Sequence, residues 1–277
     1  MIASRWTALI LLGLGYSLAL SHGGLEPPVL GVLLILCLAA FAVRSTHPAA
    51  LRGAGHAVFI ATGLGLALHW LPGFDNAPLM AMNRSSPQAF PFTTYWNLDK
   101  PLIGFWILLA CPWIWQPVDA RRTLKVALWA ALAITGLCLL LACVTGVTTW
   151  APKWPPYSLL WLLNNLLLVC LTEELLFRGY LQGALQRALQ SCTRRWPSAV
   201  VFTRPGSAAA LLPIVGVAVL FGLTHVGGGW AWTILAMLAG IGYGIAWRYG
   251  GLWAAVSAHF CLNLVHFTLF AYPMLER

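Results

Sequence analysis

Long runs of apolar residues, separated by short polar stretches, recur from one end of the chain to the other. In lipid, each such run must satisfy its own backbone hydrogen bonds, which favours helices over isolated strands. The pattern predicts about nine membrane-spanning segments, with eight as the alternative because several apolar cores are shorter than the roughly 20 residues of a straight span. The segments lie near residues 6–21, 28–43, 55–72, 101–116, 126–147, 158–180, 208–225, 230–247 and 252–272.

Composition leads to the same conclusion. Hydrophobic residues make up 60% of the 277 residues, and charged residues only 8%. Ordinary soluble domains carry roughly 25% charged residues, so this chain lacks the polar surface that water requires. We therefore predict an all-α, polytopic transmembrane helical bundle.

The basic residues are distributed unevenly between the two sides of a nine-span bundle. One side receives Arg5, Arg44, Arg52, Arg121, Arg122, Lys125, Arg187, Arg194, Arg195, Arg204 and Arg248. The other side receives Arg84, Lys100, Lys153 and Arg277, together with Glu26, Asp75, Asp99 and Glu276. This positive-inside pattern predicts a cytoplasmic N-terminus and suggests a bacterial inner membrane. It also accounts for the net charge of +9 without any nucleic-acid partner.

Two other features of the sequence have ordinary interpretations. Arg5, followed by an apolar stretch that ends at Ser21, is compatible with a cleaved signal peptide, but we favour an uncleaved first span. Six of the seven cysteines lie in apolar runs, and the chain has no CxxC pair. We interpret them as small buried residues and not as disulfides or zinc ligands.

Ionisable residues at membrane depth are concentrated in the last four predicted segments. Glu173, Glu174, Arg178, His225 and His259 all lie within or at the ends of apolar segments there, whereas the first five spans hold almost none. Because such groups are expensive in hydrocarbon, they are candidates for a functional site. We therefore divide the chain into an N-terminal scaffold of unassigned role, residues 1–157, and a functional core, residues 158–277.

Two adjacent carboxylates and an arginine lie on one predicted helix. Glu174 and Arg178 are spaced i,i+4 with the acid first, the favourable order for an ion pair on one helix face. Adjacent helical residues point about 100° apart, so Glu173 is expected to face a different neighbour and to do a different job. A carboxylate in an apolar site is a better base near neutral pH.

The other candidate residues come in pairs one helical turn apart. Phe221 and His225 lie on one predicted segment, and His259 and Asn263 lie on the last one. If these faces turn inward, one carboxylate, two imidazoles and one carboxamide meet. Those groups suffice for a glutamate-activated water and a pocket that hydrogen-bonds an oxyanion.

The three motifs EExxxR (Glu173, Glu174, Arg178), FxxxH (Phe221, His225) and HxxxN (His259, Asn263) occur in this order on separate apolar segments. Over residues 158–270 the chain resembles the CAAX prenyl protease and bacteriocin-processing membrane family, which includes the type II CAAX endopeptidases. The resemblance implies a glutamic intramembrane protease that forms no covalent intermediate and requires no metal or other cofactor.

Carried over residue by residue, the resemblance implies that Glu173 is the general base and that His225 helps to hold the attacking water. His259 and Asn263 would stabilise the oxyanion. Glu174 and Arg178 would support the site, with Phe221 beside them. The partner would be a membrane-associated protein or peptide substrate, whose identity and cleavage site the sequence does not specify.

Several alternatives remain at this stage. The chain contains no HExxH, GxGD or GxSxG motif, which argues against zinc, aspartyl and serine proteases. A metal site made of Glu173, His225 and His259 is a minor alternative. His266 lies on the same helix face as His259 and is interpreted as packing or cavity lining. The protein could also be a non-catalytic scaffold, a regulator or bacteriocin-immunity protein, or a proton-coupled transporter.

Overall fold

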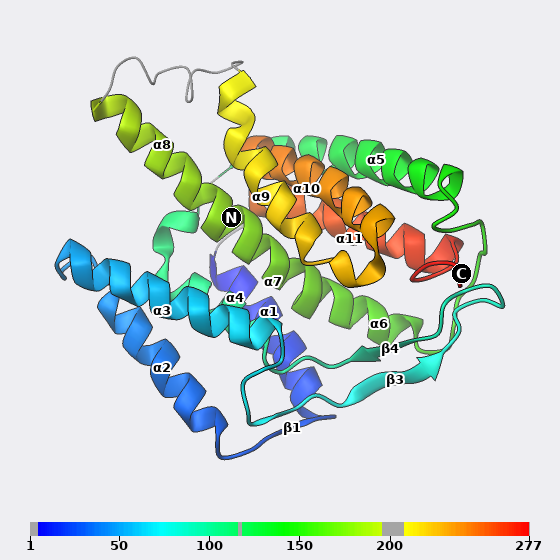
Figure 1. Cartoon of the computed structure of the whole chain (residues 1–277), viewed down its shortest axis with the longest axis horizontal. Coiled ribbons are helices and arrows are strands. Elements are labelled where there is room, and N and C mark those ends of the chain that lie inside the picture. Colours follow the sequence, from blue (N-terminus) through cyan, green and yellow to red (C-terminus); the bar gives the residue numbers. More distant parts are fainter. Residues whose placement is uncertain (1–4, 116–117, 196–207, 277) are drawn as a thin grey trace. The chain divides into compact units, whose positions relative to one another are not determined.

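The computed structural model describes residues 5–115, 118–195 and 208–276, and Figure 1 shows that helices dominate it. Within these described ranges, five helices are long and apolar enough to cross a membrane: Ala49–Ala67, Ala120–Val144, Ser158–Cys192, Trp230–Gly250 and Leu252–Leu269. Four shorter apolar helices are Arg5–Leu20, Val29–Ala42, Pro101–Ala110 and Leu212–Leu223. Each of the nine predicted segments therefore contains a helix. The all-α class is confirmed, and the protein is an integral membrane protein, whereas its membrane and orientation stay predictions.

The chain forms two compact units, of which the first comprises residues 1–82, 93–114 and 157–172. It contains α1 (Arg5–Leu20), α2 (Val29–Ala42), α3 (Ala49–Ala67) and α4 (Pro101–Ala110), followed by the short helix η1 (Pro112–Ile114). Trp106 of α4 stacks on Phe59 of α3, with ring centroids 3.7 Å apart. Its indole Nε1 donates a hydrogen bond to the Leu36 carbonyl of α2 at 2.9 Å, so this one side chain joins three helices.

Short strands that the sequence analysis did not predict lie in two connections, one between α1 and α2 and the other between α3 and α4. In one two-stranded antiparallel sheet, β1 (Gly24–Leu25) pairs with β2 (Phe74–Asp75). In the other, β3 (Pro78–Asn83) pairs with β4 (Phe92–Tyr95). These strands satisfy backbone groups between helices and leave the fold class unchanged.

The second unit comprises residues 83–92, 115–156 and 173–277. It contains α5 (Ala120–Val144), α8 (Gly183–Arg195), α9 (Leu212–Leu223), α10 (Trp230–Gly250) and α11 (Leu252–Leu269), with η5 (Ala208–Leu211) before α9. α10 packs against α5, α9 and α11. Glycines on α10 allow close packing: a Cβ at Gly240 would lie 3.2 Å from Ala218 of α9, and one at Gly242 would lie 2.4 Å from Cγ1 of Ile134.

The helix that carries the two glutamates changes its winding along its length. It runs through α6 (Ser158–Asn164), η2 (Asn165–Cys170), α7 (Leu171–Glu174) and η3 (Leu175–Gln182) into α8. Segments η2 and η3 are π-helical, so wide turns flank the glutamates on both sides. Such π-helical segments in α-helices are frequent at functional sites.

Some sequence-based expectations are not tested by the fold. Arg204 and Arg277, which contribute to the predicted charge asymmetry, lie outside the described residues. The division of the chain into a scaffold and a functional core near residue 157 also stays a prediction.

Candidate active site

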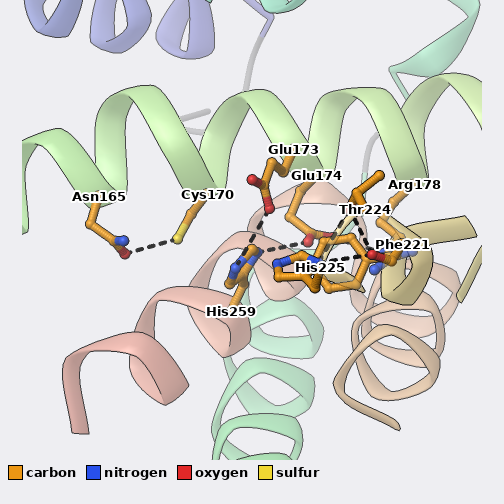
Figure 2. A network of polar contacts seen from close by, with 9 residues as sticks. All are labelled: Asn165, Cys170, Glu173, Glu174, Arg178, Phe221, Thr224, His225 and His259. Atoms are coloured by element: carbon orange, nitrogen blue, oxygen red, sulfur yellow. Dashed lines mark hydrogen bonds and ion pairs between the residues drawn. The ribbon is translucent and has the colours of Figure 1, made fainter. Parts of the chain in front are cut away.

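A buried carboxylate, Glu174, forms the centre of a polar cluster inside the second unit (Figure 2). Its Oε2 accepts a hydrogen bond from Arg178 Nε at 3.0 Å, and its Oε1 lies 2.9 Å from His259 Nδ1. The Glu174 and Arg178 side chains are fully buried, and that of His259 is 5% exposed. The i,i+4 ion pair expected from the sequence is therefore present, and the same carboxylate also binds the histidine of α11.

The contact with Glu174 sets the orientation of the His259 ring. An ionised carboxylate only accepts hydrogen bonds, so Nδ1 must carry the proton that it donates to Glu174. The other ring nitrogen, Nε2, lies 4.0 Å from Oε2 of Glu173. Figure 2 shows the two glutamates approaching the same imidazole. The expectation that Glu173 faces a different neighbour is therefore wrong, because one imidazole ring presents a separate nitrogen to each carboxylate.

The two glutamates differ in the exposure of their side chains. The Glu173 side chain is 31% exposed, whereas that of Glu174 is fully buried. The distance of 4.0 Å from Glu173 to His259 exceeds that of a direct hydrogen bond. Glu173 is thus the carboxylate that a water molecule or a substrate can reach, and Glu174 is confined to the interior.

Aromatic rings hold the His259 imidazole from two sides. Tyr243 of α10 stacks on it with ring centroids 4.6 Å apart and planes inclined by 14°. Phe221 of α9 meets it edge-on at 5.8 Å and 90°. The guanidinium carbon of Arg178 lies 5.0 Å from the Phe221 ring centroid and 5.8 Å from that of Tyr243. Phe221 and Tyr243 thus lie against both the histidine and the arginine, in cation–π geometry for the latter.

His225 lies in the turn that follows α9. Its Nδ1 is 2.9 Å from the Phe221 carbonyl and 3.2 Å from Thr224 Oγ1, and its ring is 4.8 Å from that of Phe221. A bond from Nδ1–H to the carbonyl leaves Nε2 as an acceptor. The helix ends at Leu223, and η6 (Val226–Gly228) and Gly229, with φ of +88°, turn the chain into α10. Among the described residues, no hydrogen bond joins His225 directly to Glu173.

The remaining candidates lie further along α11. Asn263 is half-buried, one turn after His259. His266 is buried one turn beyond Asn263 and contacts the rings of Trp232 and Tyr272, at 5.6 and 5.0 Å, which agrees with a packing role. In the described part of the chain, no group of three His, Cys, Asp or Glu side chains is arranged to hold a metal ion.

The fold and the cluster together define a class of protein: a helical membrane protein whose interior holds a carboxylate–imidazole–guanidinium network beside a second, accessible carboxylate. Residues 155–265 match the family model described as Type II CAAX prenyl endopeptidase Rce1-like. Over these residues the chain is therefore similar to the CAAX proteases, the family that the motifs predicted, and this similarity indicates a protease-type enzyme. No curated protein and no solved structure matches the chain.

Proposed function

We propose that the protein hydrolyses a peptide bond of a membrane-associated protein or peptide, with Glu173 as the general base. The observation that carries this proposal is the difference between the two glutamates. Glu174 is fully buried and held by Arg178 and His259, whereas Glu173 is partly accessible and lies 4.0 Å from Nε2 of the same histidine. A base must reach the water that it activates, and only Glu173 of the two can do so.

In the proposed reaction, Glu173 removes one proton from a water molecule as the water oxygen bonds to the substrate carbonyl carbon. His225 contributes the second hydrogen-bonding group for this water, because its Nδ1 is engaged by the Phe221 carbonyl and its Nε2 remains an acceptor. The carbonyl oxygen becomes an oxyanion. As the carbon–nitrogen bond breaks, Glu173 passes its proton to the leaving amine, so the products are an amine and a carboxylic acid.

His259 and Asn263 are the proposed donors to the oxyanion. For this role Nε2 of His259 must carry a proton in addition to the one on Nδ1. The Tyr243 ring stacks on the imidazole and the Glu174 carboxylate holds its Nδ1, so both contacts fix the direction of Nε2. Preorganised donors in a site of low dielectric are the strongest stabilisers of such oxyanions.

An apolar groove close to His225 favours the proposal of an extended apolar substrate. It has a volume of about 320 Å³ and is lined by Phe90, Trp230, Trp232, Met274 and Leu275, together with Gly228 and Gly229. The Gly228 amide donates to the His225 carbonyl at 3.0 Å, so the groove begins directly at the His225 turn. We propose that this groove receives apolar side chains of the substrate next to the cleaved bond.

The test compares protein termini in membranes of cells that express wild type, Glu173→Gln or Glu276→Gln. Glu276 is a matched control because it is an exposed carboxylate that binds Arg84, outside the cluster. We expect defined new termini with wild type and Glu276→Gln, and at least a 100-fold loss of them with Glu173→Gln. Equal termini in Glu173→Gln and wild-type membranes would refute Glu173 as the base. If no variant, including wild type, produced new termini while Glu173→Gln rescued a deletion phenotype, the scaffold interpretation would replace catalysis.

A further inference from the structure

A groove on the surface of the second unit lies between α5 and α10. It has a volume of about 460 Å³ and is lined by Lys125, Trp129 and Ala130 of α5 and by Ile245, Ala246 and Tyr249 of α10. The helices are in close contact at one end of it, where Thr123 Oγ1 donates to the Gly250 carbonyl at 2.9 Å. The small Ala130 and the fully buried Ala246 form the floor, and the larger side chains form the walls.

Basic side chains gather at one end of this groove. Arg121, Lys125 and Trp129 follow one another at i,i+4 intervals, so they lie in one row on α5, and Arg122 lies beside this row. All four side chains are exposed, and Trp129 is 74% exposed. The acid at this end, Asp119, accepts a hydrogen bond from the Arg122 backbone N–H at 3.0 Å as the N-cap of α5. Three basic side chains, those of Arg121, Arg122 and Lys125, thus lie near the start of α5, where the Asp119 carboxylate already caps the helix.

The end of α10 that pairs with this part of α5 carries the same chemistry. Arg248 lies in its last turn and donates to the Ala210 carbonyl at 2.6 Å, and Tyr249 is half-exposed beside it. Exposed Trp and Tyr next to Lys and Arg are typical of the level of lipid headgroups. The apolar part of the groove, from Lys125 to Ala130, extends about 7.5 Å from this level along α5. A cationic mouth above an apolar channel matches a lipid with an anionic headgroup.

We infer that the groove between α5 and α10 binds one anionic phospholipid, with its phosphate at Lys125, Arg121 and Arg122 and one acyl chain between Trp129 and Tyr249. Basic pockets between transmembrane helices recognise such headgroups through charge. The apolar lining recognises the chain and has no preference for charge. The inference is independent of the proposed proteolysis, because no residue of the groove belongs to the glutamate cluster.

The experiment titrates the purified full-length protein in a neutral detergent with dioleoylphosphatidylglycerol or dioleoylphosphatidylcholine and measures the retained lipid by native mass spectrometry. We expect one adduct that prefers phosphatidylglycerol. Lys125→Gln should weaken it about fivefold, the usual effect of one basic residue near anionic lipid. Arg44→Gln is the matched control, since Arg44 is basic and lies over the Phe41 ring but does not line the groove. Equal retention of both lipids, or equal effects of the two variants, would overturn the inference.

A second pair of measurements separates the groove from diffuse surface charge. Ala130→Leu fills the floor without changing charge and should weaken the phosphatidylglycerol adduct as much as Lys125→Gln does. If Ala130→Leu folds poorly, the test uses a lipid that is brominated on its acyl chain. This lipid should quench the tryptophan fluorescence of wild type more strongly than that of Trp129→Phe. Unchanged affinity in Ala130→Leu, or equal quenching, would mean that no acyl chain enters the groove. If a neutral lipid-modified peptide bound instead, and its binding depended on Ala130 but not on Lys125, the groove would be a site for a lipid anchor. That result would refute the phospholipid.

Discussion

In the described part of the chain, two buried carboxylates each bind a histidine, one in each compact unit. In the first unit, Asp99 Oδ2 lies 2.5 Å from His69 Nδ1, and in the second, Glu174 Oε1 lies 2.9 Å from His259 Nδ1. Both carboxylates are almost inaccessible, with side chains 2% and 0% exposed. The two pairs have the same chemistry, and their surroundings show why only one of them belongs to a candidate active site.

The first pair fastens the ends of helices. His69 follows the C-cap of α3 with φ of 57°, and its ring is 43% exposed. The other oxygen of Asp99 accepts the Lys100 backbone N–H at 2.8 Å, at the start of α4. In the second pair the histidine is 5% exposed, and the carboxylate binds Arg178 instead of a backbone group. The exposed histidine lies at a helix end, whereas the buried one presents its Nε2 to Glu173 at 4.0 Å and belongs to the candidate active site.

The largest effect is expected when the buried ion pair of Glu174 and Arg178 loses one of its two charges. Glu174→Gln leaves the buried Arg178 without its counter-charge and removes the carboxylate that His259 binds. We expect a loss of about 3–5 kcal/mol in the free energy of unfolding, measured by denaturant or thermal unfolding in detergent.

The matched double variant Glu174→Leu/Arg178→Met distinguishes stability from function. Replacing a buried ion pair by apolar residues of similar volume is often neutral for stability, so this variant should fold. It should nevertheless lose cleavage, because His259 no longer has an acceptor for Nδ1. A folded double variant with wild-type cleavage would show that the pair does not orient His259.

The corresponding change in the first unit should have a smaller effect and a different character. Asp99→Asn keeps one acceptor for the Lys100 amide but weakens the bond to His69. We expect a loss of about 1–2 kcal/mol in stability, with cleavage within twofold of wild type. His69→Ala should cost less, since its side chain is 43% exposed and solvent screens the pair. Loss of cleavage in Asp99→Asn at unchanged stability would contradict the contrast between the two pairs.

Part of the fold and part of the candidate site can be predicted from the sequence. Apolar runs reveal the nine helices, and the i,i+4 spacing reveals the Glu174–Arg178 pair, because both depend only on positions along one helix. The second partner of Glu174 could not be predicted, since spacing along one helix says nothing about which face of a neighbouring helix meets it. The π-helical turns on either side of Glu173 and Glu174 could not be predicted either, because apolar periodicity does not distinguish them from α-helical turns.

Two further features escaped the sequence for other reasons. Tyr243 lies between the glycines of α10 and belongs to no motif, so its stacking on His259 depends on how α10 packs against α11. The segment predicted over residues 208–225 ends at His225, which would place this residue within a helix. In the structure α9 stops at Leu223, and His225 lies in a turn, where helix rise no longer sets its depth.

The stacked tyrosine offers a test of how the second pair holds its imidazole. Tyr243→Phe keeps the ring, and we expect cleavage within about twofold of wild type. Tyr243→Leu removes the stack and should lower kcat about tenfold, since aromatic pairs contribute about 0.5–1.5 kcal/mol. Equal kcat values for the two variants would show that the ring only fills space.

The smallest effect concerns a charge outside the helices of the second unit. Lys153 donates hydrogen bonds to the carbonyls of Phe270 and Ala151, and burial lowers its pKa to about 8 from 10.5. Between these two values the unfolded chain binds more protons than the folded one, so stability rises with pH. We expect a gain of less than about 1 kcal/mol, because Lys153 is half-exposed and its hydrogen bonds favour the charged form. Thermal unfolding at pH 7.5 and 10 should show this rise in wild type but not in Lys153→Met. Because Lys153 lies outside the glutamate cluster, the cleavage rate of Lys153→Met at pH 7.5 should match that of wild type, as we expect for Asp99→Asn. A lower rate would mean that charges at helix ends also contribute to the active site.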